Sequence, residues 1–420
     1  MTTEEQLQTT EDEDEDGYDP FQALDQAFGA GTVRDPYPKM GELRRQSPVY
    51  KGSIWSEFGM APQEAGLLGD APIYSALSYD AVTQVLRSGS PFSSSAYANT
   101  IGMVMGHSIL EMDEPEHNTY RALIEQTFNK REMERWEADI ITPTVNSFID
   151  RFVDRGKADL VQEFTFPFPV HVITGMLGLP KEDLPKFHRW TVELINIPGD
   201  PARGMRASQK LHDYLVVVID QRRKEPREDL ISLLAHAELD GTRLNDEEIC
   251  AFLRLLLPAG AETTYRSSGN LLCGLLTNPD QLNAVRDDRS LLPQAIEEAL
   301  RWEPPLLSIM RSATEDTVVD GVPVPKGASI MVSVAAANHD ESHWDDPETF
   351  NIFRKRFPHI VFGFGAHVCL GQHLARMETS IALNTLFDRC PNLRLDPEAD
   401  EPQITGMIFR SPAKLPVLFG

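Results

Sequence analysis

The ten residues from 362 to 371, Phe-Gly-Phe-Gly-Ala-His-Val-Cys-Leu-Gly, constrain this chain more than any other stretch. They place a lone cysteine, Cys369, in a glycine-bearing loop directly before residues 370–386, whose pattern predicts a helix. The start of a helix carries unpaired N–H groups and a partial positive charge, so a cysteine beside it is favoured as the thiolate. Gly365 and Gly371 would let the backbone turn sharply and let a flat cofactor lie close against it.

A loop of this composition could also form without binding a flat cofactor through its sulfur. An arbitrary cysteine in a glycine-rich turn is usually a buried, inert thiol. A dinucleotide-binding turn of the Gly-x-Gly-x-x-Gly type is the second alternative, and it fails because Val368 stands where the third glycine should be.

The loop resembles the haem-binding loop of the cytochrome P450 family, whose pattern is matched by Phe362, Gly365, His367, Cys369 and Gly371. The resemblance implies a haem b cofactor with Cys369 as the metal ligand, because thiolate ligation pushes electron density onto iron and favours O–O cleavage. It also implies the cytochrome P450 fold, which is mainly α with a smaller β-rich region. In that fold the haem is buried between a long central helix and the helix after the cysteine loop.

A second constraint is the stretch from residue 244 to residue 276, whose pattern predicts one long helix. Asn245 is the expected cap, and Glu248 three positions later completes a capping box. A helix of this length measures roughly 45 Å and would cross a whole domain. Pro258 removes one of its backbone hydrogen bonds, so we expect a kink.

This helix contains the motif Ala-Gly-Ala-Glu-Thr-Thr at 259–264, which matches the oxygen-activating motif of the same family. Taken alone, Glu-Thr-Thr is an ordinary polar stretch of an amphipathic helix. The resemblance implies that the Thr263 hydroxyl holds oxygen and an ordered water, that Glu262 relays protons, and that Gly260 leaves space for the oxygen.

His117 and Arg121 are four residues apart, which places both on one face of a helix where they could hold a pair of carboxylates. A solvated helix face is the alternative. The family uses these positions to bind a haem propionate, and the resemblance assigns Arg311 and His367 to the same task.

Glu298 and Arg301 match the Glu-x-x-Arg pair of the family, which is buried there and locks the loop ahead of the cysteine. A third partner is in doubt, because Thr349 stands where many members have an arginine. Arg354 and His359 are both candidates for that position, and the sequence leaves the choice open.

The segments that the resemblance places around the substrate are mostly apolar, which favours a small apolar substrate such as a fatty acid, a terpenoid or a steroid-like molecule. One of them, residues 97–109, is rich in methionine, and pliant methionine surface suits variable apolar ligands. The expected pocket residues are Met103, Ala259, Leu306, Ile309 and Ile408.

Local patterns predict several further elements: a strand at 71–77, a helix at 79–87, a hairpin whose turn is Asp320-Gly321, and a break at 196–201 between two lid helices. We expect residues 35–420 to form a single domain. Residues 1–34 contain the acidic run from Glu11 to Asp16 and are expected to be a disordered tail.

Composition excludes some partners. The formal net charge of -25 disfavours binding to nucleic acid or anionic lipid. No stretch approaches eighteen uninterrupted apolar residues, so we expect no membrane segment. The four cysteines show no Cys-x-x-Cys pair and fit a reducing compartment, and a cytoplasmic location is expected.

The chain has no flavin or iron–sulfur motif, so the resemblance implies a separate electron source, a ferredoxin with its NAD(P)H-dependent reductase. Basic side chains in segments expected on the thiolate side would form its docking patch, although a scatter of solvated charges is an equal alternative. These side chains are Lys130, Arg131, Arg354, Lys355, Arg356 and Arg376.

The expected activity is that of a haem-thiolate monooxygenase that uses O2. One alternative is a peroxygenase driven by hydrogen peroxide, but such members lack the acid–alcohol pair that Glu262 and Thr263 form here. The other alternative is a haem-binding or sensor protein without turnover.

Overall fold

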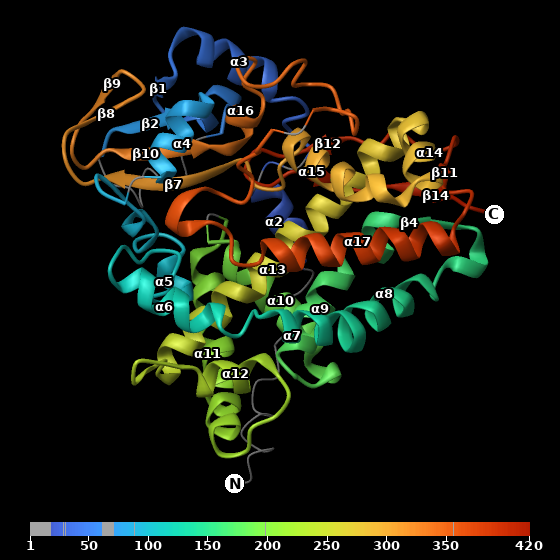
Figure 1. The fold of residues 1–420 in the computed structure, drawn as a ribbon, viewed down its shortest axis with the longest axis horizontal. Coiled ribbons are helices and arrows are strands. Elements are labelled where there is room, and N and C mark those ends of the chain that lie inside the picture. The colour runs from blue at the N-terminus through green and yellow to red at the C-terminus, as the bar shows by residue number, and fades with distance from the viewer. Residues whose placement is uncertain are drawn as a thin grey trace.

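The computed structural model describes residues 18–27, 29, 31–60, 71–87, 89–197, 199–355 and 357–420. Figure 1 shows a large helical part beside a smaller part that contains the main sheet. This arrangement confirms the expected fold class, mainly α with a smaller β-rich region. Within the described residues no helix is long and apolar enough to cross a membrane. The single-domain expectation stays a prediction.

The main sheet has five strands in the order β1-β2-β10-β7-β3. Only β10 and β2 run parallel, while the other neighbours are antiparallel. Its strands are β1 (Val49–Lys51), β2 (Ile73–Ala76), β10 (Ser329–Ser333), β7 (Ser308–Ala313) and β3 (Phe92–Ser93). The smaller sheets contain β4 (Lys157–Asp159), β11 (Arg394–Leu395) and β14 (Pro416–Leu418); β5 (Glu238–Leu239) and β6 (Thr242–Arg243); β8 (Thr317–Val319) and β9 (Val322–Val324); β12 (Ile404–Thr405) and β13 (Ser411–Pro412).

The helical part is built around α13, which runs from Asp246 to Thr277 and contacts both α9 and α17. The helices of the described chain are α2 (Pro20–Ala27), α3 (Tyr37–Gln46), α4 (Tyr79–Arg87), α5 (Gly102–Met105), α6 (Glu116–Glu125), α7 (Lys130–Trp136), α8 (Thr142–Ile149), α9 (Pro167–Met176), α10 (Leu184–Ile195), α11 (Pro201–Lys224), α12 (Leu230–His236), α13, α14 (Pro279–Asp287), α15 (Leu292–Trp302), α16 (Val334–Asn338) and α17 (Gln372–Arg389).

The long helix begins as its sequence predicts. The Asn245 side chain accepts a hydrogen bond from the backbone of Glu248, whose carboxylate accepts from the backbone of Asn245. Pro258 lies inside the helix, which continues past it. The strand β2, the helix α4 and the β8–β9 hairpin also form where local patterns predict them, and Asp320 and Gly321 adopt positive φ at the hairpin turn.

The N-terminal segment differs from its prediction. Residues 1–17, with the acidic run, lie outside the described residues. The expectation of a disordered tail as far as residue 34 is wrong, because Pro20–Ala27 forms α2, which packs against α10. Leu24 is 2% exposed and belongs to the core. The centre of the Phe21 ring lies 5.3 Å from that of Phe166 and 4.7 Å from that of His188. Apolar burial of these side chains offsets the ordering entropy of the segment.

Candidate active site

A cavity of about 340 Å³ lies between α13 and α17, beside the cysteine loop. Both helices bring polar and apolar side chains to it, and α6 and β7 close one end. The loop from Phe362 to Gly371 forms part of its wall, and Cys369 is exposed there. Each residue of the predicted loop motif except Gly365 lines this cavity.

The cysteine loop is held by its backbone. The Cys369 N–H donates to the Phe362 carbonyl at 2.7 Å, which closes the loop into a tight turn. Gly365 has φ +75°, and a Cβ at this position would meet the Leu86 carbonyl oxygen at 2.5 Å. Only glycine fits there. Gly371 has φ -81°, so it is not the sharp-turn glycine that we expected; instead, no protein atom lies within 4 Å of its missing Cβ.

The environment of the Cys369 thiol contains opposing effects. Cys369 is exposed only to the cavity, and desolvation by the surrounding protein raises the pKa of its thiol, while the backbone N–H groups of Gly371 and Gln372 and the nearby Arg121 and Arg376 lower it. The backbone N–H groups at the start of α17 act in the expected direction, toward the thiolate, but desolvation of the sulfur outweighs them in the protein alone. The protein presents the sulfur at a helix start, and an ion bonded to it would have to stabilise the anion.

Basic side chains from three elements, two arginines and two histidines, meet at one end of the cavity. His117 and Arg121 come from α6, Arg311 from β7 and His367 from the cysteine loop. The rings of His117 and His367 lie 4.0 Å apart. Burial, together with Arg311, His117 and Arg121, lowers the pKa of His367 to about 3.

This cluster has donors without acceptors. His117 is 1% exposed, and neither ring nitrogen has a hydrogen-bond partner in the described part of the chain. Arg311 is 5% exposed, and its guanidinium donates to its neighbour's carbonyl, that of Met310, at 2.7 Å without pairing with any described carboxylate. Arg121 is the exception, because it pairs with Glu125 at 2.7 Å. Buried polar groups of this kind require hydrogen-bond partners, and a molecule with carboxylates at this end of the cavity would supply acceptors and balance the arginine charges.

Two neighbouring residues of the α13 motif, Glu262 and Thr263, have different environments. Thr263 lines the cavity, and its hydroxyl donates to the Ala259 carbonyl at 2.7 Å. Glu262 does not line the cavity; it is 3% exposed, and its carboxylate pairs with Arg266 at 3.2 Å. Burial raises the pKa of Glu262 above its ordinary value, while Arg266 opposes this shift.

Gly260 also lines the cavity, but the space beside it is taken. A Cβ at this position would lie 2.6 Å from Cδ1 of Ile173 on α9. The missing side chain therefore lets α9 and α13 approach closely, and its expected role in making space for oxygen stays a prediction.

Three of the five expected pocket residues, Ala259, Leu306 and Ile309, line the cavity. The expectation for Met103 is wrong for this structure, because its side chain is 46% exposed on α5 while the neighbouring Val104 and Met105 take the buried positions. Ile408 is also outside the cavity wall, since it packs against two core clusters instead.

Sequence reasoning missed several members of the wall. Ile173 from α9 and Phe252 from α13 carry no local signal that distinguishes them from core residues. Glu378 on α17 is the most unusual of these residues: it is 1% exposed, lines the cavity, and has one carboxylate oxygen without a partner in the described chain. Burial holds the pKa of this carboxyl well above its usual range.

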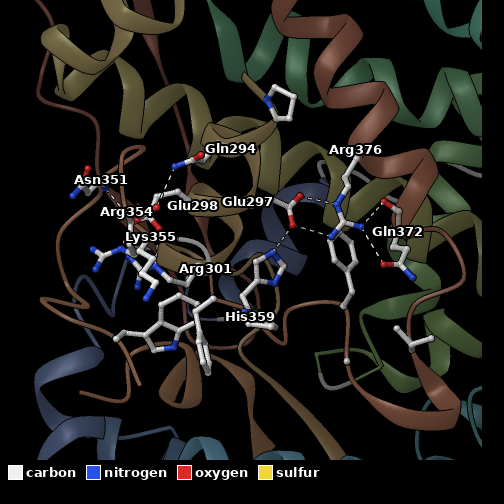
Figure 2. Close-up of a pocket in the computed structure, with 17 residues that line it drawn as sticks. Gln294, Glu297, Glu298, Arg301, Asn351, Arg354, Lys355, His359, Gln372 and Arg376 are labelled. Atoms are coloured by element: carbon white, nitrogen blue, oxygen red, sulfur yellow. Dashed lines mark hydrogen bonds and ion pairs between the residues drawn. The ribbon is translucent and has the colours of Figure 1, made fainter. Parts of the chain in front are cut away.

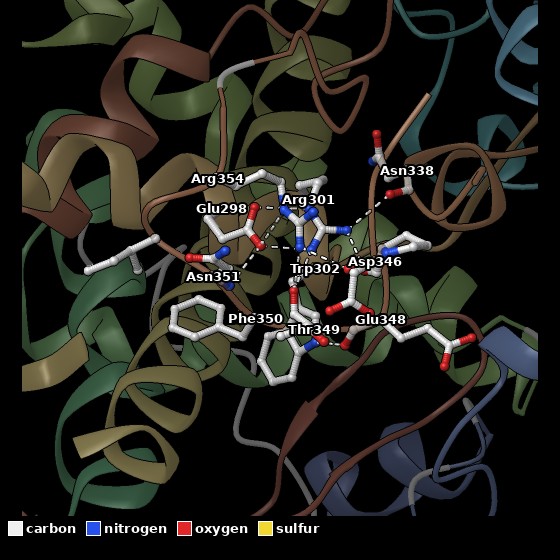
Figure 3. Close-up of polar contacts among 12 residues, drawn as sticks. Glu298, Arg301, Trp302, Asn338, Asp346, Glu348, Thr349, Phe350, Asn351 and Arg354 are labelled. Atoms are coloured by element: carbon white, nitrogen blue, oxygen red, sulfur yellow. Dashed lines mark hydrogen bonds and ion pairs between the residues drawn. The ribbon is translucent and has the colours of Figure 1, made fainter. Parts of the chain in front are cut away.

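The Glu298–Arg301 pair is buried, and the choice of its third partner is resolved in favour of Arg354 (Figure 3). Glu298 lies 2.8 Å from Arg301 and 3.1 Å from Arg354, and it also accepts the N–H of Asn351 at 3.0 Å. The carbonyl of Thr349, the residue where an arginine was expected, accepts from both arginines.

His359 belongs to a neighbouring ion pair instead. Glu297 lies between His359 and Arg376 (Figure 2). Its carboxylate oxygens are 3.0 Å from His359 Nε2 and 2.6 Å from Arg376 Nε. Although burial raises the pKa of Glu297, these two partners hold it at about 2. Glu297, His359 and Arg376 all line a second cavity of about 720 Å³, which borders the cysteine loop at Phe362.

The expected basic patch is smaller than its sequence suggests. Arg354 pairs with the buried Glu298 and its side chain is only 12% exposed, while Arg376 pairs with Glu297. Lys130, Arg131 and Lys355 are exposed, and Arg356 lies outside the described residues.

Comparison with known proteins agrees with this geometry. A family model described as Cytochrome P450 matches residues 67–419. The cytochrome P450 monooxygenase PikC of Streptomyces venezuelae is 34% identical over 88% of this chain and 87% of its own, and the steroid C26-monooxygenase of Mycolicibacterium smegmatis is 35% identical over 88% and 95%. The crystal structure of CYP109E1 from Bacillus megaterium in complex with testosterone superimposes with a TM-score of 0.81 and 30% identity, over 92% of this chain and 99% of that one.

Proposed function

Because the chain belongs to the cytochrome P450 family of enzymes, we propose that it is a monooxygenase that inserts one oxygen atom of O2 into a mainly apolar small molecule. The observation that carries this proposal is the convergence at one cavity of Cys369, a buried cationic cluster and Thr263. These groups come from segments far apart in the chain, and each suits one requirement of haem-thiolate chemistry.

The family's cofactor is a haem bound through a thiolate, and we infer that haem b is the form this chain holds. Cys369 would be the iron ligand, and the open space beside Gly371 would accept the flat ring. His117, Arg121, Arg311 and His367 would hold the propionates, whose charges satisfy the unpaired donors of that cluster. When bound, such a group supplies the electron-transfer and O2 chemistry that no side chain can.

The chain's own residues would manage water and protons. The Thr263 hydroxyl donates its hydrogen to the Ala259 carbonyl, which leaves its lone pairs free to accept a hydrogen bond from the cavity side. Glu262 is adjacent to Thr263 and its pKa is raised by burial, so it holds a proton more readily than an exposed glutamate does. Its carboxylate is turned toward Arg266 and would have to rotate to reach the cavity.

The substrate end of the cavity is apolar. Its wall includes Ile109, Leu110, Ile173, Phe252, Leu255, Leu256, Ala259, Leu306, Ile309 and Val334. The cationic cluster at the other end would be neutralised by the propionates. A fatty acid, terpenoid or steroid-like molecule therefore fits better than a highly charged one.

Bacterial members of the family act on small molecules with electrons from redox partners. For this chain we propose a ferredoxin and its NAD(P)H-dependent reductase, docking where Lys355 is exposed near the cysteine loop. Lys355→Glu should weaken ferredoxin binding at low salt and slow electron transfer. Because Arg354 is part of the buried network, its replacement would confuse docking with stability.

Two substitutions test the enzymatic proposal. Cys369→His should abolish the absorption band of the reduced carbon monoxide complex that marks thiolate ligation, and persistence of that band would refute the ligand assignment. Thr263→Ala should leave substrate binding intact while electrons are diverted to peroxide; tightly coupled product formation by this variant would contradict its role.

Measuring NAD(P)H consumption and oxygenated product, with and without the redox partners, separates the alternatives. A monooxygenase consumes NAD(P)H only with its redox partners and forms oxygenated product. A peroxygenase forms that product from hydrogen peroxide alone, and a sensor protein forms none.

A further inference from the structure

A single buried arginine, Arg266, contacts carboxylates from two different helices. Its side chain is 4% exposed, and the nitrogen Nη2 lies 3.2 Å from Glu262 and 3.3 Å from Asp25. Glu262 is one turn away on the same helix, whereas Asp25 belongs to α2, about 240 residues earlier in the chain. One guanidinium group is therefore shared by a buried carboxylate and by one whose side chain is 46% exposed.

The arginine is held in place by further contacts. Its Nη1 donates to the Ser411 hydroxyl at 3.0 Å, and its guanidinium carbon lies 4.6 Å from the centre of the Tyr265 ring. Arg266, Asp25 and Tyr265 are the other ionisable groups that face Glu262 in the described chain. Arg266 is thus the one cation in this group, and it balances only one of two carboxylates.

The chemistry of arginine limits what it can do here. A guanidinium does not release its proton, so Arg266 cannot pass protons between Asp25 and Glu262. It can hold a carboxylate by charge-assisted hydrogen bonds and decide which way that carboxylate points. In this structure it holds Glu262 on the side of α13 away from the cavity, while the next residue, Thr263, lines the cavity.

We propose that Arg266 is a positioning residue that restrains Glu262, and that Asp25 shares this arginine and so sets how readily the Glu262 carboxylate turns toward Thr263. The inference rests on the proposed role of Glu262 as a proton carrier. Without Asp25 the whole charge of Arg266 acts on Glu262, and the restraint tightens. The N-terminal helix α2, which the packing of Phe21 and Leu24 fixes in place, thereby becomes part of the control of proton delivery.

A double-mutant cycle tests the restraint without turnover. The thermal unfolding midpoint of the haem-loaded protein is measured for Asp25→Asn, Glu262→Gln and the double variant. We expect Glu262→Gln to lower the midpoint more in the Asp25→Asn background, by about 1–3 °C beyond the sum of the single shifts. Additive shifts would overturn the proposal.

Asp220→Asn is the matched control, because Asp220 is 55% exposed and pairs with Lys224 without contacting Arg266. Its cycle with Glu262→Gln should be additive. Since Arg266→Gln could fail to fold, Arg266→Lys serves as the conservative variant: it should keep the native fold but lose the non-additivity, since an ammonium lacks the fork that serves both carboxylates. Retention of full coupling in Arg266→Lys would count against the arginine's specific role.

Turnover supplies the second readout. Asp25→Asn should slow substrate oxidation by about two- to ten-fold and raise its solvent deuterium isotope effect, while Asp220→Asn changes neither. An unchanged rate and isotope effect in Asp25→Asn would overturn the control by α2. If Glu262→Gln itself proves silent in turnover, the proton-carrier role fails, and the unfolding cycle still decides whether Arg266 is shared.

Discussion

Two adjacent glutamates on α15 allow the value of burial to be measured with one kind of substitution. Glu298 is 5% exposed and accepts hydrogen bonds from Arg301, Arg354 and the backbone of Asn351. Glu297 is 37% exposed and pairs with Arg376 and His359. The same change, glutamate to glutamine, removes one negative charge from each.

The expected costs differ because solvent can replace only one of the two carboxylates. Glu298→Gln leaves Arg301, whose side chain is 1% exposed, beside Arg354 with no counter-charge. Breaking a buried pair in this way costs about 3–5 kcal/mol. The carbonyls of Asn338, Pro347 and Thr349 still accept from Arg301, so we expect the lower end of that range. Glu297→Gln should cost less than about 1 kcal/mol, since water reaches the Glu297 carboxylate, which is 37% exposed, and screens its charge.

Urea unfolding of the haem-loaded protein measures both costs. Far-UV circular dichroism and the Soret band should be followed together, because coincident transitions justify a two-state free energy. We expect the Glu298→Gln midpoint to fall well below that of Glu297→Gln, with similar slopes. Equal losses in the two variants, or a loss under about 1 kcal/mol for Glu298→Gln, would refute the argument that burial makes this network structural.

Gly365→Ala should lower the unfolding midpoint, because φ +75° costs an L-residue about 1–2 kcal/mol and the new methyl group would meet the Leu86 carbonyl; a wild-type midpoint would contradict this. Gly371→Ala should unfold like the wild type but lose haem faster to apomyoglobin, since its Cβ enters only the open cavity; unchanged haem loss would argue against a ring beside this residue. Glu378→Gln should stabilise the protein more at pH 8 than at pH 5. Burial raises the pKa of Glu378 above its ordinary value of 4.5, so the wild type loses stability as the pH rises past that value while the variant does not. Equal differences at the two pH values would show that this carboxyl is not buried as a neutral acid.

The features that the sequence predicted correctly depend on residues that are close together in the chain. The capping box of α13 needs Asn245 and Glu248 within one turn, and the Glu298–Arg301 pair needs a spacing of three. The cysteine loop likewise closes through a backbone hydrogen bond from the Cys369 N–H to the Phe362 carbonyl. Backbone geometry over a few residues determines such contacts, and a motif therefore records them.

Contacts between distant segments were decided only by the packing of the elements. Arg354 rather than His359 completes the Glu298 network because the loop after α16 brings Arg354 to it. The helix α2 replaced part of an expected tail because Leu24 found a core to pack against. Glu262 points away from the cavity toward Arg266, and only the packing of α2 brings Asp25 to the same arginine.

By itself, then, the sequence determined the family, the cysteine loop and the long helix, whose signals are local. The tertiary structure decided which charges meet, which side chains line the cavity and which way each carboxylate points. These outcomes depend on the free energy of burying groups far apart in the chain, and no short stretch of sequence contains that information.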